Sequence, residues 1–242
     1  MDEAGLWTDG RYFVQAENQL KDSTVTLYRM GEEGVPTVDE FVKDRLKEGG
    51  CLGFDGRVVN GTWGGKLEKI AAEKNVSMHV TEDLIDLIWE DRPALSKQPL
   101  FILEEKYSGK STADKIADLR KAMKENGADV HILTSLYDIA WLLNIRGNDI
   151  DYVPVVLSYL VLNETECIWF LQEEVVDDKI RAYLEEKHIT TKPYDAIYDY
   201  VPEIPADAVV LMNRGTVNYR IVNSLDKAVS YTHLTLPTIC SV

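Results

Sequence analysis

The chain has 242 residues, 45% of them hydrophobic and 28% charged, with a formal net charge of −15 at pH 7. This length and balance indicate one large or two smaller globular domains with a sizeable core. The acidic charge disfavours a nucleic-acid partner, because it repels phosphate backbones. No apolar run approaches the roughly 20 residues of a membrane span, and the three cysteines are widely spaced, so we expect a cytoplasmic protein without a membrane partner.

Strands and helices alternate in the first part of the chain. We expect strands at residues 5–8, 25–28, 52–55 and 76–80, and helices at 11–20, 37–46 and 67–74. Thr37 and Glu40 have the spacing of a capping box at a helix start. Asp9, Gly10 and Arg11 follow the first strand. We interpret them as a structural turn in preference to a ligand-binding one, because glycine supplies the backbone conformation that such turns need.

The second part of the chain repeats this alternation. We expect helices at 111–126, 135–143, 177–187 and 196–201, and strands at 129–133, 155–162, 166–171, 189–192 and 208–212. The order strand, turn, helix, strand, helix occurs both at 3–46 and at 166–201, and the strand end at 53–55 matches that at 211–213. The sequence therefore predicts an α/β fold of two related units, each a mixed sheet covered by helices. Two prolines between residues 92 and 99 indicate the boundary.

The last residues, 228–242, read as a translated sequencing adapter. Residues 230–238, Ser-Tyr-Thr-His-Leu-Thr-Leu-Pro-Thr, carry no charge and continue no apolar periodicity. They translate an adapter of the transposase mosaic-end kind, and an index followed by GTG TAG would encode the remainder and a stop. We therefore expect residues 228–242 not to be natural protein, to have no evolved partner in the fold, and to be disordered or only loosely packed.

The polar loop at residues 144–154 is the strongest candidate for a binding role, since loops between rigid elements commonly carry binding groups. Its candidate residues are Asn144, Arg146, Asp149 and Asp151. The Arg146 guanidinium could bind a carboxylate in a forked geometry and so help to shape substrate access. It could equally pair with Asp149 or Asp151 and only fix the loop. The sequence leaves both alternatives open.

No residues have the spacing of a metal site or of a catalytic group. His79, His131 and His188 each stand apart from HxxEH and HExxH patterns, so we expect structural roles for all three. The glycine-containing loops at 31–34 and 61–65 fit neither of the nucleotide-binding motifs GxGxxG and GxxxxGK(S/T).

Several segments together resemble aminopeptidase P of the creatinase and prolidase superfamily. They are Leu-Trp-Thr-Asp-Gly-Arg-Tyr-Phe at 6–13, Val-Pro-Thr at 35–37, Gly-Phe-Asp at 53–55, Tyr-Ser-Gly at 107–109 and Trp-Leu-Leu-Asn-Ile-Arg-Gly-Asn-Asp-Ile at 141–150. The resemblance implies a partial creatinase N-terminal domain I at 1–92, a linker at 93–110 and a creatinase N-terminal domain II at 111–227. In the family a catalytic "pita-bread" domain follows, which we expect to be absent here.

The resemblance also implies a parent metallopeptidase that releases the N-terminal residue before proline. Its two divalent metals, manganese or zinc, would be bound by the absent domain. This chain alone is expected to hold no catalytic residue, metal or cofactor, to be inactive, and to support substrate access and assembly. Its partners would be the parent's own catalytic domain, proline-containing peptides and, as one option, a second copy in a homodimer. Two alternatives stay open: a non-enzymatic creatinase-like binding module, or the N-terminal part of a prolidase or creatinase.

Overall fold

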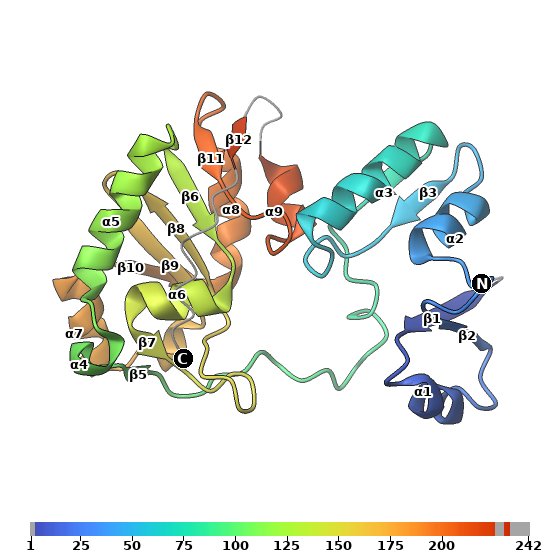
Figure 1. Cartoon of the computed structure of the whole chain (residues 1–242), viewed down its shortest axis with the longest axis horizontal. Helices are drawn as coiled ribbons and strands as arrows, with labels where there is room; N and C mark the ends of the chain where they lie inside the picture. Colours follow the sequence, from blue (N-terminus) through green and yellow to red (C-terminus); the bar gives the residue numbers. More distant parts are fainter. Residues whose placement is uncertain (1–2, 226–229, 233–242) are drawn as a thin grey trace. The chain divides into compact units, whose positions relative to one another are not determined.

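The computed structural model describes residues 3–225 and 230–232 (Figure 1). Contacts between Cα atoms divide the chain into two compact units, described here one at a time. Unit 1 comprises Met1–Gly53 and Gly65–His79, and unit 2 comprises Phe54–Gly64 and Val80–Val242. None of the described helices is long and apolar enough to cross a membrane.

Unit 1 contains two pairs of parallel strands and three helices in the described residues. β1 (Ala4–Thr8) pairs with β2 (Val25–Arg29), and β3 (Cys51–Gly53) pairs with β4 (Ser77–His79). The helices are α1 (Phe13–Gln19), α2 (Val38–Arg45) and the part of α3 (Gly61–Glu73) that begins at Gly65. The Trp7 and Tyr28 rings stack with centroids 4.2 Å apart, and both meet the edge of Phe41. The predicted capping box is confirmed, because Thr37 and Glu40 bond to each other's backbone at the start of α2.

Unit 2 is built on a mixed sheet of six strands in the described part of the chain, in the order β10-β9-β8-β6-β11-β12. β8 runs antiparallel to both β6 and β9, and the other neighbours are parallel. The strands are β6 (Val130–Leu133), β8 (Tyr159–Asn163), β9 (Cys167–Leu171), β10 (Thr190–Pro193), β11 (Val209–Leu211) and β12 (Ser230–Thr232). A separate antiparallel pair joins β5 (Phe101–Ile102) to β7 (Ile145–Arg146).

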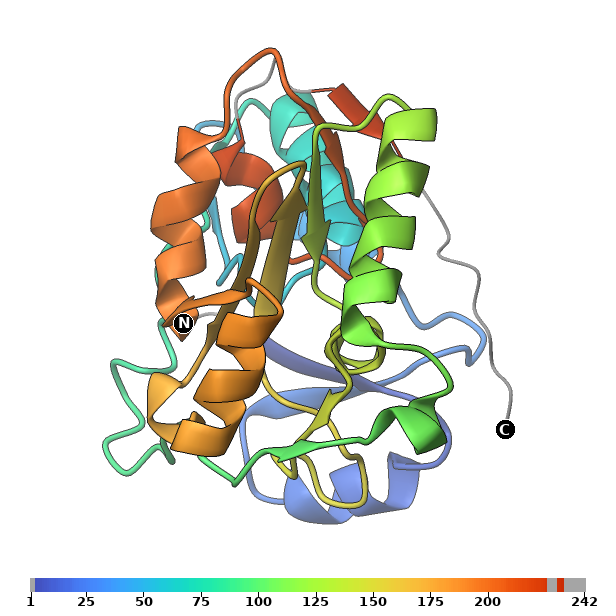
Figure 2. The ribbon, with the colours of Figure 1, turned by 90° about the vertical axis from the view of Figure 1, so that its left-hand side faces the viewer.

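Helices cover both faces of this sheet (Figure 2). One buried cluster includes residues of α5 (Thr112–Glu125), α6 (Leu136–Leu143) and α7 (Asp178–Glu186), and the other includes residues of α8 (Ile197–Tyr200) and α9 (Tyr219–Ser224). All five residues of β9 are buried, as expected for a strand covered on both faces. The short helix α4 (Glu105–Ser108) and 3-10 turns at Glu173–Val175, Tyr194–Ala196 and Val201–Glu203 complete the unit. A mixed sheet with helices, as the sequence predicts, is therefore confirmed.

The division by contacts falls after His79, whereas the sequence indicates a linker at 93–110. Residues 80–100 contain no helix or strand, yet they are tied to unit 2. Gly56 N donates to Val80 O (2.9 Å), and the Lys97 ammonium pairs with Glu174 (2.8 Å). A proline-rich segment can thus belong to the unit that it precedes. That the chain consists of two related domains stays a prediction.

Three residues of the chain's last segment pair with the sheet. Ser230–Thr232 form β12, which pairs in parallel with β11, a segment for which we expected no evolved partner. The exposed edge of a strand offers unpaired N–H and C=O groups to any extended backbone, so such pairing does not require matched side chains. The remaining residues of 228–242 lie outside the described part of the chain.

Two segments of unit 2, residues 54–64 and 212–222, have the same local structure. Each begins with a turn after a strand, in which Arg57 N donates to Asp55 Oδ1 and Gly215 N donates to Asn213 Oδ1, both at 2.9 Å. Each then starts a helix capped by asparagine. Asn60 Oδ1 accepts from Trp63 N (2.8 Å), and Asn218 Oδ1 accepts from Ile221 N (3.0 Å).

These two segments also bond to each other reciprocally. Gly61 N donates to Val217 O (2.8 Å), and the equivalent Tyr219 N donates to Val59 O (2.7 Å). A second reciprocal pair joins Thr62 N to Arg214 O and Arg220 N to Gly56 O, each at 2.9 Å. This is the pattern of a local twofold axis, centred on the bridge between Asn60 and Asn218. A Cβ atom at Gly64 would lie 2.1 Å from the Tyr219 ring, so glycine is required there.

Candidate functional site

Asp9, Gly10 and Arg11 form the turn after β1, in unit 1. Arg11 N donates to Asp9 Oδ1 (3.0 Å), and the Arg11 guanidinium forks onto both oxygens of the same carboxylate (2.9 and 2.8 Å). The hydrogen bond from Arg11 lowers the pKa of Asp9 to about 2. Both side chains are exposed and bind each other. That the turn is only structural stays a prediction.

The candidate loop of unit 2 begins at a fixed point, Asn144. This residue ends α6 with a left-handed backbone, at φ 51°, and is 2% exposed. Its Oδ1 accepts a hydrogen bond from Lys115 Nζ (2.7 Å), and its Nδ2 donates to Lys110 O (2.9 Å). The first residue of the loop is therefore held by α5 and by the segment that precedes it.

Lys115 of α5 is a buried cation, 1% exposed, which the sequence did not single out. Its ammonium also donates to Trp141 O (2.7 Å) and lies 4.5 Å from the centre of the Trp141 ring. Burial, followed by the positive charges of Arg146 and Lys110, lowers the pKa of Lys115 to about 8. None of the ion pairs found among the described residues involves Lys115. The carbonyl end of α6, the negative end of its dipole, faces this charge instead.

Arg146 lies on β7 and is half-buried. Its Nη1 donates to Ala140 O, near the end of α6, and to Ile145 O (3.0 Å). Burial lowers the pKa of this guanidinium. Within the described part of the chain, neither Asp149 nor Asp151 forms an ion pair with Arg146. The pairing that would only fix the loop is therefore not the one observed.

The two aspartates of the loop have separate positions. Asp149 Oδ2 accepts from Leu157 N (2.8 Å) and its Oδ1 accepts from Gln98 N (3.4 Å), which ties the far side of the loop to the chain on either side. Asp151 is exposed in the turn that Val153 N closes onto Ile150 O (3.1 Å). Of the four candidates, the structure brings Asn144 and Arg146 together at the end of α6, and places Asp149 and Asp151 elsewhere on the loop.

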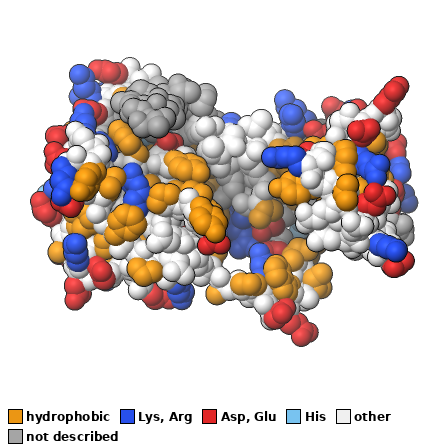
Figure 3. All heavy atoms as spheres, turned by 60° about the horizontal axis from the view of Figure 1, so that its bottom comes forward, with side chains coloured by type: hydrophobic (Ala, Val, Ile, Leu, Met, Phe, Trp, Pro, Cys, Tyr) orange, Lys and Arg blue, Asp and Glu red, His pale blue; other side chains and the backbone are white. Residues whose placement is uncertain are grey.

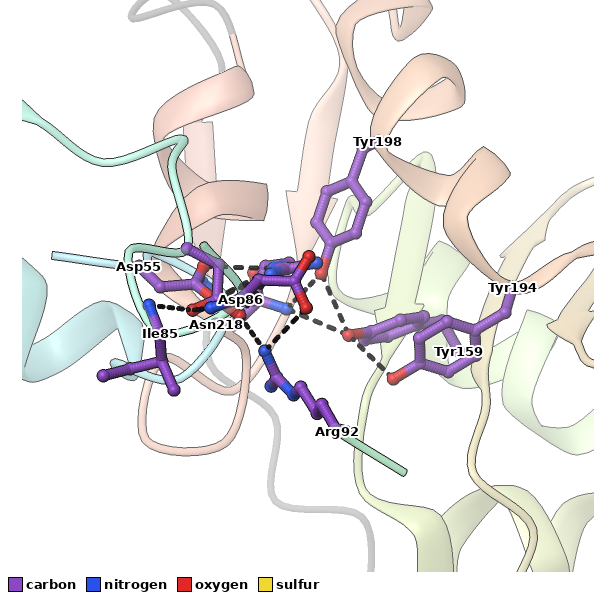
Figure 4. Close-up of polar contacts among 10 residues, drawn as sticks. Asp55, Ile85, Asp86, Arg92, Tyr159, Tyr194, Tyr198 and Asn218 are labelled. Atoms are coloured by element: carbon purple, nitrogen blue, oxygen red, sulfur yellow. Dashed lines mark hydrogen bonds and ion pairs between the residues drawn. The ribbon is translucent and has the colours of Figure 1, made fainter. Parts of the chain in front are cut away.

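A second polar constellation in unit 2 was missed by the sequence analysis (Figure 4). The Tyr159 hydroxyl lies 3.1 Å from that of Tyr198 and 3.3 Å from that of Tyr194. Asn218 Nδ2 donates to both Tyr159 (3.1 Å) and Tyr198 (3.0 Å). Burial is the largest cause of the raised pKa of all three tyrosines, so their hydroxyls stay neutral.

Two arginines share an aspartate beside these tyrosines. The Arg57 guanidinium forks onto Asp55 and also reaches Asp83 Oδ2 (3.1 Å), which pairs with Arg92 as well (2.5 Å). Arg92 also reaches Asp86 (3.4 Å). With the tyrosines, Arg57 and Arg92 line an open cavity of 460 Å³. No sequence signal linked these positions, since the outermost two, Asp55 and Tyr198, are 143 residues apart.

The match to known families decides which kind of domain this is. Residues 91–240 match the Creatinase/Prolidase N-terminal domain. The chain belongs to this family. The sequence-based resemblance to the creatinase and prolidase superfamily is thereby confirmed.

Relatives of this creatinase-type chain are aminopeptidases of greater length. A probable Xaa-Pro aminopeptidase P of Coprinopsis cinerea is 38% identical over 207 residues, which are 85% of this chain and 33% of the relative. Aminopeptidase P2 of Arabidopsis thaliana is 34% identical over 231 residues, 94% of this chain and 32% of the relative. The chain thus spans about a third of the length of the curated relatives it matches.

A solved structure agrees with these relatives. X-prolyl aminopeptidase from Caenorhabditis elegans, described as a cytosolic enzyme with a di-nuclear active site, superposes with a TM-score of 0.89 at 32% identity. The match covers 97% of this chain and 39% of the worm enzyme.

The described residues of this creatinase-type chain do not fit a metal site of that kind. No group of three or more His, Cys, Asp or Glu among them is arranged to hold a metal ion. His131 is buried on β6, where its Nδ1, like Trp169 Nε1, has no hydrogen-bond partner among the described atoms. No catalytic step through a metal follows from these residues.

Proposed function

We propose that the chain is the non-catalytic N-terminal region of an Xaa-Pro aminopeptidase, a metallopeptidase that releases the residue before proline. The observation that carries this proposal is the superposition on the worm X-prolyl aminopeptidase, which covers 97% of this chain but 39% of that enzyme. The chemistry would then belong to the remainder of the parent, with two divalent metals, manganese or zinc. The parent would act in the cytoplasm, as the worm relative does.

Within the parent, the chain is proposed to supply two related α/β domains that support substrate access. Loop 144–154 is the part suited to this task, because both of its ends are fixed. Asn144 ties its start to Lys115 of α5, Arg146 donates to Ala140 O of α6, and Asp149 accepts from two backbone N–H groups. A loop fixed in this way can present side chains to the catalytic domain or to a proline-containing peptide with little loss of conformational entropy. A homodimer would be compatible with the same arrangement.

The test compares this chain with its extended reading frame. The purified chain, given Mn²⁺ and an Xaa-Pro peptide, should show no turnover above a metal-free blank. The extended protein should cleave the same peptide, lose this activity with a chelator and regain it with Mn²⁺. Turnover by the short chain, or an extended protein that binds metal but leaves Xaa-Pro peptides intact, would contradict the proposal.

A further inference from the structure

The end of α6 gathers positive charge that no acidic side chain balances by an ion pair among the described residues. Lys115 is buried against Trp141 O and Asn144 Oδ1, and Arg146 is half-buried against Ala140 O. The two cations are close enough for Arg146 to lower the pKa of Lys115. Buried charges are usually paired with opposite charges, because removing an ion from water is costly. Among the described residues neither cation forms an ion pair, although Lys110 nearby does so with Asp118.

Arg146 retains an unused donor edge. A guanidinium has five N–H donors. Its two hydrogen bonds to described residues both come from Nη1, and they fix the side chain against the backbone carbonyls of Ala140 and Ile145. Nε and Nη2 have no acceptor in the described part of the chain. These two nitrogens form the edge of the guanidinium that binds both oxygens of a carboxylate in parallel.

The two acidic residues of the loop lie elsewhere. Asp149, three positions along the loop, accepts backbone N–H groups from Leu157 and Gln98. Asp151 is exposed in the turn at the tip. The edge therefore faces no carboxylate of its own loop, and the neighbouring Lys115 makes the surroundings more positive.

We propose that Arg146 is a carboxylate receptor, oriented by α6, whose Nε and Nη2 bind both oxygens of one carboxylate. This inference rests on the proposed function and names the ligand class of the same loop. The carboxylate has two sources with the same chemistry: the C-terminus of a short peptide substrate, or an Asp or Glu of the remaining polypeptide. Lys115 acts through Asn144 and the end of α6, as a positioning residue.

The experiment uses the extended protein with Arg146→Lys, which keeps the charge but loses the planar fork. Its probes are an Xaa-Pro tripeptide with a free C-terminus and the same peptide amidated. Arg120→Lys is the matched control, because Arg120 of α5 likewise donates to a backbone carbonyl, Asn163 O (2.9 Å). Unfolding temperatures of this chain and of the extended protein are measured for every variant.

If the peptide supplies the carboxylate, Arg146→Lys raises KM for the free acid about tenfold and leaves kcat and the amide's KM unchanged. If the remaining polypeptide supplies the carboxylate, Arg146→Lys changes KM for both peptides equally, and the unfolding temperature falls more in the extended protein than in this chain. Arg120→Lys should cause neither pattern. Two results would overturn the proposal. In one, Arg146→Lys changes KM equally for the free acid and the amidated peptide and lowers the unfolding temperature equally in the two proteins. In the other, Arg146→Lys changes neither KM nor the unfolding temperature.

Failure of this inference is distinguishable from failure of the proposed function. An extended protein without peptidase activity still reports through the difference in unfolding temperature. If the extended enzyme is active and Arg146→Lys changes neither KM nor the unfolding temperature, the inference of a carboxylate receptor fails and the proposed peptidase function stands.

Discussion

Acid should destabilise this protein through one buried imidazole, that of His131. The side chain is 6% exposed on β6, between Leu162 of β8 and Leu211 of β11. Burial lowers the pKa of His131 from 6.5 to about 4. Between those two values the unfolded chain binds a proton that the folded chain does not, so the free energy of unfolding falls as pH falls from 6.5 to 4. At about 1.4 kcal/mol per pKa unit, the full loss is about 3 kcal/mol.

The assay is urea unfolding between pH 4.5 and 7.5, followed by tryptophan fluorescence, on the wild-type chain and His131→Leu. Leucine suits the site because its neighbours in the sheet are Leu162 and Leu211, and because His131 Nδ1 has no partner to lose among the described atoms. Paired carboxylates also titrate in acid, but they do so in both proteins. The variant should therefore gain about 2.5 kcal/mol over the wild type between pH 7.5 and 4.5.

Replacement of the exposed His188 provides the control. His188 has a left-handed backbone, at φ 56°, which asparagine tolerates, so His188→Asn should keep the acid loss of the wild type. A stability difference between wild type and His131→Leu that is constant within about 0.5 kcal/mol across this pH range would refute the reasoning.

Three further predictions concern packing, capping and the end of the chain. Asn144→Ala should lower the free energy of unfolding by about 3–4 kcal/mol, through the lost bond to the Lys115 ammonium, the orphaned Lys110 O and the left-handed backbone. Asn144→Gly should recover about 1 kcal/mol of this in the same urea assay, and equal losses for the two variants would exclude a backbone contribution. Gly64→Ala should destabilise by about 1–2 kcal/mol, since a Cβ 2.1 Å from the Tyr219 ring outweighs the better helix propensity of alanine; a stabilised variant would contradict the close approach. The DNA from the last two bases of codon 228 onward should read as the mosaic end, an index and GTG TAG, and any other codons for these residues would end the adapter hypothesis.

Local sequence signals predicted the elements of unit 2 well. Ser111 accepts from Asp114 N at the start of α5, as expected from its position before an apolar helical stripe. The strand expected at 155–162 begins later, at Tyr159, because the preceding residues bend with Asp149 bonded to Leu157 N. Propensity does not encode such a bond between a side chain and a backbone N–H across a loop.

The candidate site shows the same limit. Periodicity located the loop at 144–154 but could not choose a partner for Arg146, because its acceptors, Ala140 O and Ile145 O, are backbone atoms without sequence identity. The tyrosine constellation went unnoticed because Tyr159 and Tyr198 meet Asn218 only after β8, α8 and α9 have packed. Chemistry that arises from tertiary packing leaves no local spacing in the sequence.

The reciprocal bonding of residues 54–64 with 212–222 couples the lengths of the two segments. Each supplies donors and acceptors at equivalent positions, so deleting one residue between Gly56 and Gly61 would move Gly61 N away from Val217 O and also displace Val59 O from Tyr219 N. A single insertion or deletion would therefore break bonds on both sides of the axis. Only simultaneous changes at equivalent positions would preserve the pairing, so the two segments cannot change in length independently of each other.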